Sequence, residues 1–311
     1  MKKISVIIPA YNKAELTVRT VQSVLDQSYE NIEVLVVDDG SNDDTRIRLQ
    51  LFGDKIKYLY KENGGACSAR NLGIRKSSGE YIALIDCDDL YYPDKILKSV
   101  KYLDKNTEIG FVHTAINLID NYDDTIGYLG FPVNRVTGYI ARRLIVTNLV
   151  NNSTVVIRRE CFEKVGLFDE SIFIPADWDM WLRLAEDYKA GYIDEPLSGY
   201  RITENYSINH LQMKLKESVY VLEKAIKRNK IEFTTNLINR CYANLYYRMG
   251  KLHGANGEIG VGRDYFKKAL KYHFSDLKII THYFLSLLLP KILEDNLRKR
   301  HKTNQKNLES V

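Results

Sequence analysis

Cysteine is scarce in this sequence, and its few cysteines are not grouped. Cys67, Cys87, Cys161 and Cys241 form no CxxC motif and no closely spaced framework. This spacing excludes a small disulfide-stabilised scaffold and offers no zinc site. We therefore expect reduced thiols, as in a cytosolic protein.

Long apolar runs are also missing. The N-terminal segment MKKISVIIPAYN reaches Pro9 after a few apolar residues, too few for the core of a signal peptide. The longest apolar run, Tyr283 to Leu289, ends at Pro290, whereas a membrane-spanning helix needs about 20 residues. We expect a cytoplasmic protein, either soluble or peripheral on the inner face of the membrane, that does not span it.

No strong excess of one charge marks the chain as a whole. Its 311 residues include 45 Lys and Arg and 40 Asp and Glu, a net charge of +5. The charges are unevenly distributed, because residues 211–311 hold 20 basic and 9 acidic side chains, which leaves 25 and 31 for residues 1–210. The two parts are expected to meet different partners. No recognised motif for nucleic acid accompanies the basic part, so nucleic acid is not an expected partner.

What the chain does contain is an alternation of short β-branched runs with amphipathic stretches. Nearly continuous apolar strands alternating with helices predict an α/β fold, with a mostly parallel central sheet covered on both faces. The predicted strands are ISVIIPA (4–10), IEVLVVDD (32–39), IKYLY (56–60), YIALID (81–86), FVHTAINLI (111–119) and TVVIRRECF (154–162), and the predicted helices span about 16–25, 43–52, 66–76 and 177–188.

Beyond residue 210 helical patterns replace the strands, so we predict one domain over residues 1–210 and a helical region over 211–311. Residues 237–272 read as two helices around a Gly-rich turn, similar to one tetratricopeptide-type pair. The apolar stretch 283–290 and the basic tail 291–302 predict an amphipathic surface for anionic lipid. A helical cap with a solvated Lys/Arg face is the alternative.

The strongest chemical signal is Asp86-Cys87-Asp88-Asp89, at the end of a predicted strand. Three carboxylates in four residues repel one another and need compensating positive charge. A divalent cation would supply it, and oxygen ligands favour Mg²⁺ or Mn²⁺. A solvated acidic turn or a helix N-cap is the competing interpretation.

A second acidic pair, Asp38-Asp39, ends a neighbouring predicted strand and is followed by Gly40 and Ser41. Gly40 permits a tight turn, and a carboxylate there could accept hydrogen bonds from a base or a ribose. The alternative is a cap for the helix that follows, a role that Asp43 and Asp44 fill better.

Seven segments, in this order and spacing, resemble family 2 glycosyltransferases with the GT-A fold for nucleotide-diphospho-sugars. The resemblance covers residues 3–207 or so. The segments are ISVIIPAYN, VVDDGSNDDT, NGGACSARNLGI, GEYIALIDCDD, YYPDKI, RRECFEKVGLFDE and ADWDMWLRL.

The resemblance implies a nucleotide pocket in which Pro9, Ala10 and Tyr11 form the floor and wall. Asp39 would hydrogen-bond the base, and Arg70 would approach the nucleotide or help to hold Asp39. Tyr11 could instead be an ordinary packed residue, and Arg70 could lie on a solvated helix face.

The resemblance also implies the reacting groups. Asp86 would bind the ribose, Asp88 the Mn²⁺ or Mg²⁺ that bridges the two phosphates, and Asp177 would be the general base for the acceptor hydroxyl. Asp177 and Asp179 could both simply complement the helix dipole. We favour Asp177 because Asp179 should point elsewhere on the helix. Trp178 is a candidate to face a sugar ring.

Two departures from the family pattern limit this comparison. Ala176 stands where relatives often have Glu before the base, and Thr203 stands where they have His in a Tyr-Arg-x-His segment. His210 could replace that histidine only if its loop folds back.

These residues together predict an enzyme of the hexosyltransferase type, an inverting, metal-dependent glycosyltransferase. The donor would be a nucleotide-diphospho-sugar, and we expect a UDP-linked one. The acceptor would be a glycan or lipid-linked hydroxyl in the synthesis of cell-surface polysaccharide or glycoconjugate. A sugar nucleotidyltransferase is disfavoured because no Gly-rich basic loop lies near the N-terminus, and a Rossmann oxidoreductase because no GxGxxG follows the first strand. A non-catalytic nucleotide-sugar-binding protein remains the alternative from another class.

Overall fold

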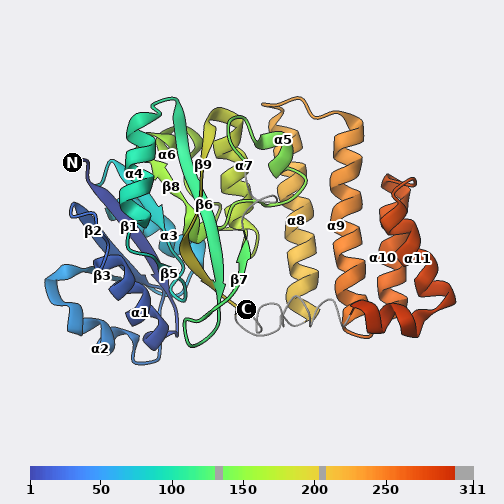
Figure 1. Cartoon of the computed structure of the whole chain (residues 1–311), viewed down its shortest axis with the longest axis horizontal. Coiled ribbons are helices and arrows are strands. Elements are labelled where there is room, and N and C mark those ends of the chain that lie inside the picture. Colours follow the sequence, from blue (N-terminus) through green and yellow to red (C-terminus); the bar gives the residue numbers. More distant parts are fainter. Residues whose placement is uncertain (130–135, 203–207, 298–311) are drawn as a thin grey trace. The chain divides into compact units, whose positions relative to one another are not determined.

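The computed structural model describes residues 1–129, 136–202 and 208–297, and the chain divides into two compact units (Figure 1). The first comprises Met1–Ala141 and Asn148–Thr203, and the second Arg142–Thr147 and Glu204–Val311. The domain boundary near residue 210 stays a prediction. The assignment of residues 142–147 to the second unit was not foreseen from the sequence.

A single sheet forms the centre of the first unit. Over the described residues its order is β3-β2-β1-β4-β8-β6-β9-β5, and β7 pairs with β6. The pairs β1–β2, β1–β4, β2–β3 and β6–β9 are parallel, whereas β8, β5 and β7 run antiparallel to their neighbours. The predicted α/β fold is confirmed, and among the described strands β1, β2, β3, β4, β6 and β9 run in one direction, whereas β5, β7 and β8 run in the other. The strands are β1 (Ile4–Ala10), β2 (Ile32–Asp38), β3 (Lys57–Tyr60), β4 (Tyr81–Leu84), β5 (Leu90–Tyr91), β6 (Ile109–Ile119), β7 (Thr125–Leu129), β8 (Val156–Arg158) and β9 (Lys189–Arg201).

Helices pack around this sheet in Figure 1. Every residue of β1 is buried, as expected for a central strand covered on both faces. Because β1, β2 and β4 are parallel neighbours, their carboxyl ends share one edge of the sheet, and the site lies there. The helices are α1 (Ala14–Leu25), α2 (Thr45–Leu49), α3 (Ala66–Lys76), α4 (Lys95–Lys105), α6 (Arg159–Val165) and α7 (Ala176–Asp187), with 3₁₀ turns at Gln50–Lys55 and Asn152–Thr154. The short helix α5 (Ala141–Leu144) falls largely in the second unit.

One predicted strand is largely wrong, and one long strand was missed. In TVVIRRECF only Val156–Arg158 is extended, and α6 begins at Arg159. This helix ends at Gly166, whose φ of 80° is a conformation that glycine favours at a helix terminus. The missed strand is β9, in which Gly191, Pro196 and Gly199 interrupt the apolar pattern. Its parallel pairing with β6 holds it in the sheet despite register shifts.

The described regular elements of the second unit are helices. Gly257, with a φ of 87°, turns the chain between α9 and α10, and these two form the helix pair predicted over residues 237–272. Gly250 and Gly262 let the two helices approach closely, because a Cβ on Gly262 would lie 2.7 Å from the carbonyl oxygen of Gly250. Within the described residues, no helix combines the length and the apolar character needed to cross a bilayer. The helices are α8 (Ile208–Arg228), α9 (Thr235–Ala255), α10 (Ile259–Tyr272) and α11 (Leu277–Leu288), with further helix over 290–297.

Candidate active site

The last residues of β1 bring the predicted nucleotide pocket to the edge of the sheet. Pro9 and Ala10 are buried and pair with β2 at Val37 and Asp38. Tyr11 follows the strand with 46% of its surface exposed, so it is not the packed core residue of the competing interpretation. The backbone N–H of Asp39 donates to the carbonyl of Ala10 at 2.8 Å.

Asp39 lies in a cradle of donors from the loop before α3. Its carboxylate accepts hydrogen bonds from the backbone N–H groups of Gly64 at 3.0 Å and Gly65 at 2.7 Å, and from Lys61 Nζ at 2.6 Å. The side chain is 5% exposed. Gly40 is required for the close approach of this loop, because a Cβ there would lie 2.8 Å from the backbone nitrogen of Asn63. Asp39 is therefore held rigidly where β2 ends.

The neighbouring Asp38 has a different task. It accepts hydrogen bonds from the backbone N–H of Ser41 at 2.8 Å and from the hydroxyl of Tyr58 at 2.5 Å. Burial and the Asp38 carboxylate raise the pKa of Tyr58, which keeps this hydroxyl a donor. Asp38 thus stabilises the turn and leaves Asp39 as the candidate for ligand binding.

Asp86 is held by two buried side chains. Its Oδ1 accepts from Arg70 Nη2 at 2.6 Å and from Asn152 Nδ2 at 2.8 Å. Arg70 is 8% exposed, so it does not lie on a solvated helix face, and its ion pair is with Asp86 rather than with Asp39. Within the described residues, Arg70 Nε and Asn152 Oδ1 are buried without a hydrogen-bond partner. Asn152 carried no signal that singled it out in the sequence.

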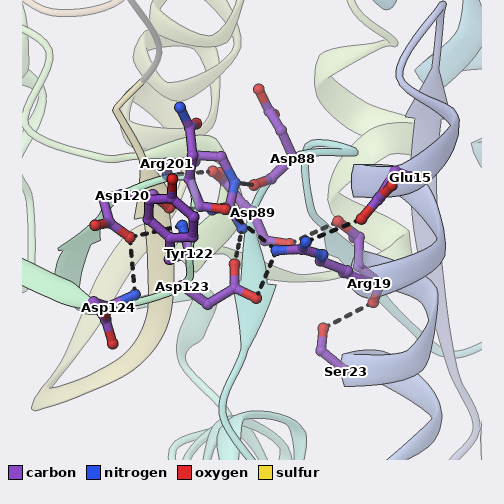
Figure 2. A network of polar contacts seen from close by, with 12 residues as sticks. Glu15, Arg19, Ser23, Asp88, Asp89, Asp120, Tyr122, Asp123, Asp124 and Arg201 are labelled. Carbon is purple, nitrogen blue, oxygen red and sulfur yellow. Dashed lines mark hydrogen bonds and ion pairs between the residues drawn. The ribbon is translucent and has the colours of Figure 1, made fainter.

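The other two carboxylates of the acidic segment, Asp86-Cys87-Asp88-Asp89, point in different directions (Figure 2). Asp88 points to Lys13 at the start of α1 and forms an ion pair with its ammonium group. Asp89 is 1% exposed and accepts from the Ser153 hydroxyl and, at 2.9 Å, from the backbone N–H of Arg201. Burial, followed by the charges of its acidic neighbours, raises the pKa of Asp89 well above its ordinary value.

This divergence bears on the predicted metal. Among the described residues no three His, Cys, Asp or Glu side chains gather closely enough to hold an ion. The carboxylate of Asp88 nevertheless fits Mg²⁺ or Mn²⁺, because it is a partly exposed oxygen donor whose ion pair, within the described residues, is with the partly exposed Lys13. Burial lowers the pKa of Lys13, but Asp88 outweighs this effect and the pKa is raised. An ion at Asp88 would take its other ligands from water and phosphate.

Asp177 lies in the first turn of α7. Its carboxylate accepts from the backbone N–H of Trp178 at 2.7 Å and from Asn148 Nδ2 at 2.9 Å. Burial raises the pKa of Asp177, while the positive charge of Arg70 opposes the shift. A raised pKa brings a carboxylate closer to the range in which a general base works well.

The other candidates near Asp177 are accounted for by packing. Asp179 is fully buried and forms an ion pair with Arg183 at 2.8 Å, so it points away from Asp177 as expected. Trp178 is 4% exposed and Trp181 is fully buried, which leaves little ring surface for a sugar. Thr203 and the side chain of His210 lie outside the described part of the chain.

The architecture is the predicted GT-A fold followed by a helical region. Residues 1–349 of TarS from S. aureus, solved in complex with UDP-GlcNAc, superpose with a TM-score of 0.64 at 17% identity, over 96% of this chain and 92% of that one. The mannosyltransferase PcManGT of Pyrobaculum calidifontis, solved with GDP-Man and Mn²⁺, gives a TM-score of 0.63 at 19% identity, over 99% and 87%. At these identities the likeness concerns the fold.

The chain belongs to glycosyl transferase family 2, whose sequence model matches residues 5–166. A glycosyltransferase of uncharacterized activity from Rickettsia typhi is 37% identical over 221 residues, which are 67% of this chain and 68% of that protein. In three other Rickettsia relatives, each 35% identical, the match covers only 31 to 35% of a longer protein. The chain is thus a transferase, and its reaction is glycosyl transfer.

Proposed function

We propose that this glycosyltransferase takes its sugar from a nucleotide-diphospho-sugar, and that the nucleotide is UDP. It transfers the sugar with inversion to a hydroxyl of a glycan or lipid-linked acceptor in the synthesis of cell-surface polysaccharide or glycoconjugate. One observation carries the proposal: Arg70 binds Asp86 directly, and the pKa of Asp177 is affected by the charges of both Arg70 and Asp86. A candidate donor-binding residue and a candidate base therefore lie within electrostatic reach of each other at the carboxyl edge of the sheet.

The donor would bind across the ends of β1, β2 and β4. Pro9, Ala10 and Tyr11 would contact the nucleotide, Asp39 the base and Asp86 the ribose. The cradle around Asp39 supports this assignment, because it fixes an acceptor in one orientation before the ligand arrives. The two similar structures were solved with UDP-GlcNAc and with GDP-Man, which are ligands of this kind.

The diphosphate brings negative charge to an edge that already carries several carboxylates. Asp88 would hold Mn²⁺ or Mg²⁺, and the bound ion would stabilise the charge that develops on the leaving phosphates. Lys13, released from Asp88, would offer a further positive charge to the same phosphates. PcManGT, which shares the fold, was solved with Mn²⁺.

Asp177 would accept the proton of the acceptor hydroxyl as that oxygen attacks the anomeric carbon. Attack from the face opposite the leaving phosphate inverts the configuration at this carbon, and a single carboxylate base suffices. Asn148 keeps one carboxylate oxygen oriented by its hydrogen bond. The position of Asp177 favours a catalytic role over that of a non-catalytic binding protein, because only catalysis requires a base.

The test is a panel of nucleotide sugars, assayed for thermal stabilisation and for release of nucleoside diphosphate with Mn²⁺ or with EDTA. We expect one donor class to stabilise the protein in Mn²⁺ and not in EDTA. Asp88→Asn should weaken this stabilisation and abolish turnover, whereas Asp94→Asn, at the half-buried turn before α4, should change neither. Equal UDP affinity in Mn²⁺ and in EDTA would contradict the metal assignment, and no binding of any nucleotide sugar would contradict the function.

We also propose that the second unit attaches peripherally to an anionic membrane on the cytoplasmic face, where a lipid-linked acceptor would be presented. Helix α11 buries Ile279 and Ser286 on one face. Its opposite face exposes an apolar stripe of Leu277, Phe284 and Leu288, at 77%, 52% and 75%. Positions seven and four residues apart on a helix lie on one side. With the basic excess of residues 211–311, this stripe is suited to an anionic lipid surface.

A further inference from the structure

Arg201 is a charged residue buried in the first unit, where each of its three guanidinium nitrogens donates a hydrogen bond. Its side chain is fully buried, and it ends β9 next to the acidic segment. Its Nε donates to the backbone carbonyl of Asp88 at 2.8 Å, and its own backbone N–H donates to Asp89 Oδ1 at 2.9 Å. Arg201 therefore forms hydrogen bonds with two successive residues of the acidic segment, Asp88 and Asp89.

The other end of the guanidinium group binds the turn between β6 and β7. Its two terminal nitrogens donate to the carbonyl of Asp120 and to the carboxylate of Asp123. Figure 2 shows Arg201 among these groups, with Arg19 approaching Asp123 from α1. Arg19 Nη1 donates to Asp123 at 3.2 Å, and its Nη2 pairs with Glu15 at 3.0 Å. The arrangement ties the acidic segment to a second loop and to α1.

The conformation of the turn between β6 and β7 favours its hydrogen bonds with Arg201. Asp123 has a φ of 72°, in the left-handed region that a non-glycine residue rarely adopts. The carboxylate of Asp120 accepts from the backbone N–H groups of Tyr122 at 2.8 Å and Asp124 at 3.0 Å. These bonds hold the turn in the conformation that presents the Asp120 carbonyl and the Asp123 carboxylate to Arg201.

We infer that Arg201 is a positioning residue, which orients the Asp88 carboxylate by holding the Asp88 peptide group. This inference rests on the proposed function, in which Asp88 holds the cation. The side chain of Asp88 is directed to Lys13 while its carbonyl is directed to Arg201. With the carbonyl fixed, the backbone cannot rotate and carry the carboxylate away from the cation site. Removing a residue that orients a metal ligand by a hydrogen bond usually weakens metal binding by about 10- to 100-fold.

The test replaces Arg201 by lysine, which keeps the charge but cannot bind three acceptors as a planar fork. Arg158→Lys is the matched control, because Arg158 Nε also donates to a backbone carbonyl at 2.8 Å, that of Ile109. Arg158 pairs with Tyr81 at the opposite, amino-terminal end of β4. Binding of Mn²⁺ in the presence of UDP is followed by the electron paramagnetic resonance signal of free Mn²⁺, and thermal unfolding without metal reports the integrity of the fold.

We expect Arg201→Lys to raise the Mn²⁺ concentration at half-maximal binding by about 10-fold or more, and Arg158→Lys to leave it unchanged even where it lowers the melting temperature. Asp123→Asn, which removes one partner of Arg201 and keeps the contact with Asp88, should shift the midpoint in the same direction by a smaller factor. It serves as the test if Arg201→Lys does not fold.

The inference is wrong if wild-type protein binds Mn²⁺ with UDP and the midpoints of Arg201→Lys, or of Asp123→Asn in its place, are unchanged. It is equally wrong if Arg158→Lys shifts the midpoint as much as Arg201→Lys. Absence of Mn²⁺-dependent UDP binding in the wild-type protein is a different result, because it refutes the metal assignment on which the inference depends.

Discussion

Lys95 is buried in the first unit without an acidic partner among the described residues, and this predicts a measurable effect of pH on stability. The residue begins α4 and has no exposed surface. Its Nζ donates to Ser99 Oγ at 3.1 Å and lies 5.3 Å from the centre of the Tyr91 ring. Burial lowers the pKa of Lys95 from 10.5 to about 7. Nearby His113 is also buried, and burial lowers its pKa to about 4, with the charge of Lys95 contributing.

The magnitude follows from the proton balance between the folded and unfolded chains. Between pH 7 and 10.5 the unfolded chain keeps the Lys95 proton and the folded chain releases it. The free energy of unfolding therefore rises with pH in this window, by about 1.4 kcal/mol per unit from this group. Below pH 7 both states carry the proton, and the full cost of burying the ammonium remains, about 4 to 5 kcal/mol. His113 is neutral throughout this window and does not add to the slope.

Lys95→Met removes the titrating group and fills nearly the same volume. We expect the variant to be more stable than the wild type at pH 7, by up to about 4 kcal/mol, and the difference to shrink by about 2 kcal/mol at pH 9. Urea unfolding at pH 7, 8 and 9 under reducing conditions measures both quantities. Fluorescence follows the first unit alone, because it contains both tryptophans, Trp178 and Trp181.

The matched control is Lys101→Met, at an exposed position of the same helix, which should give no difference that varies between pH 7 and 9. A difference for Lys95→Met that stays constant across the three pH values would refute the reasoning. A variant less stable than the wild type at pH 7 would show that the ammonium group has a partner that offsets its burial.

Two further predictions concern the proposed function. Asp177→Asn should lower turnover by about 10²- to 10⁴-fold while donor binding persists, the usual scale for removal of a general base; near-normal turnover here, with a loss in correctly folded Asp179→Asn, would move the role by two residues. Replacing Phe284 and Leu288 by Glu should abolish flotation of the protein with anionic liposomes, whereas Leu51→Glu, at an exposed apolar position of the first unit, should not. If flotation does not depend on lipid charge, on salt concentration or on the α11 substitutions, this face of α11 does not bind lipid as proposed.

The elements that the sequence predicted well are those whose pattern is local and uninterrupted. Residues 4–10 and 32–38 are runs of β-branched and aliphatic residues, and they became strands with nearly the predicted bounds. β9 could not be predicted in the same way, because Gly and Pro interrupt it and its stability comes from β6, about 80 residues earlier. TVVIRRECF misled because the β-branched signal of its first half hides the change to a helix at Arg159.

The candidate site was predicted where motifs carry it and missed where the fold alone brings residues together. Asp39, Asp86, Asp88 and Asp177 each follow a strand or open a helix, which the sequence makes visible. Lys13, Asn148 and Asn152 were missed, because a lone lysine or asparagine has no local pattern and reaches the carboxylates only through the crossing of separate elements. The role of each named carboxylate stays a prediction.

The ion pair of Lys13 with Asp88 has a consequence for the order in which ligands arrive. A divalent cation that reaches Asp88 must exchange with an ammonium group rather than enter a site of unbalanced negative charge. A displaced lysine needs a new counter-charge, and the donor's diphosphate supplies one. Cation and donor would then strengthen each other's binding by the same factor, because coupling between two ligands is reciprocal. On the proposed metal assignment Lys13 would act as an exchangeable counter-ion, and free cation alone would bind weakly.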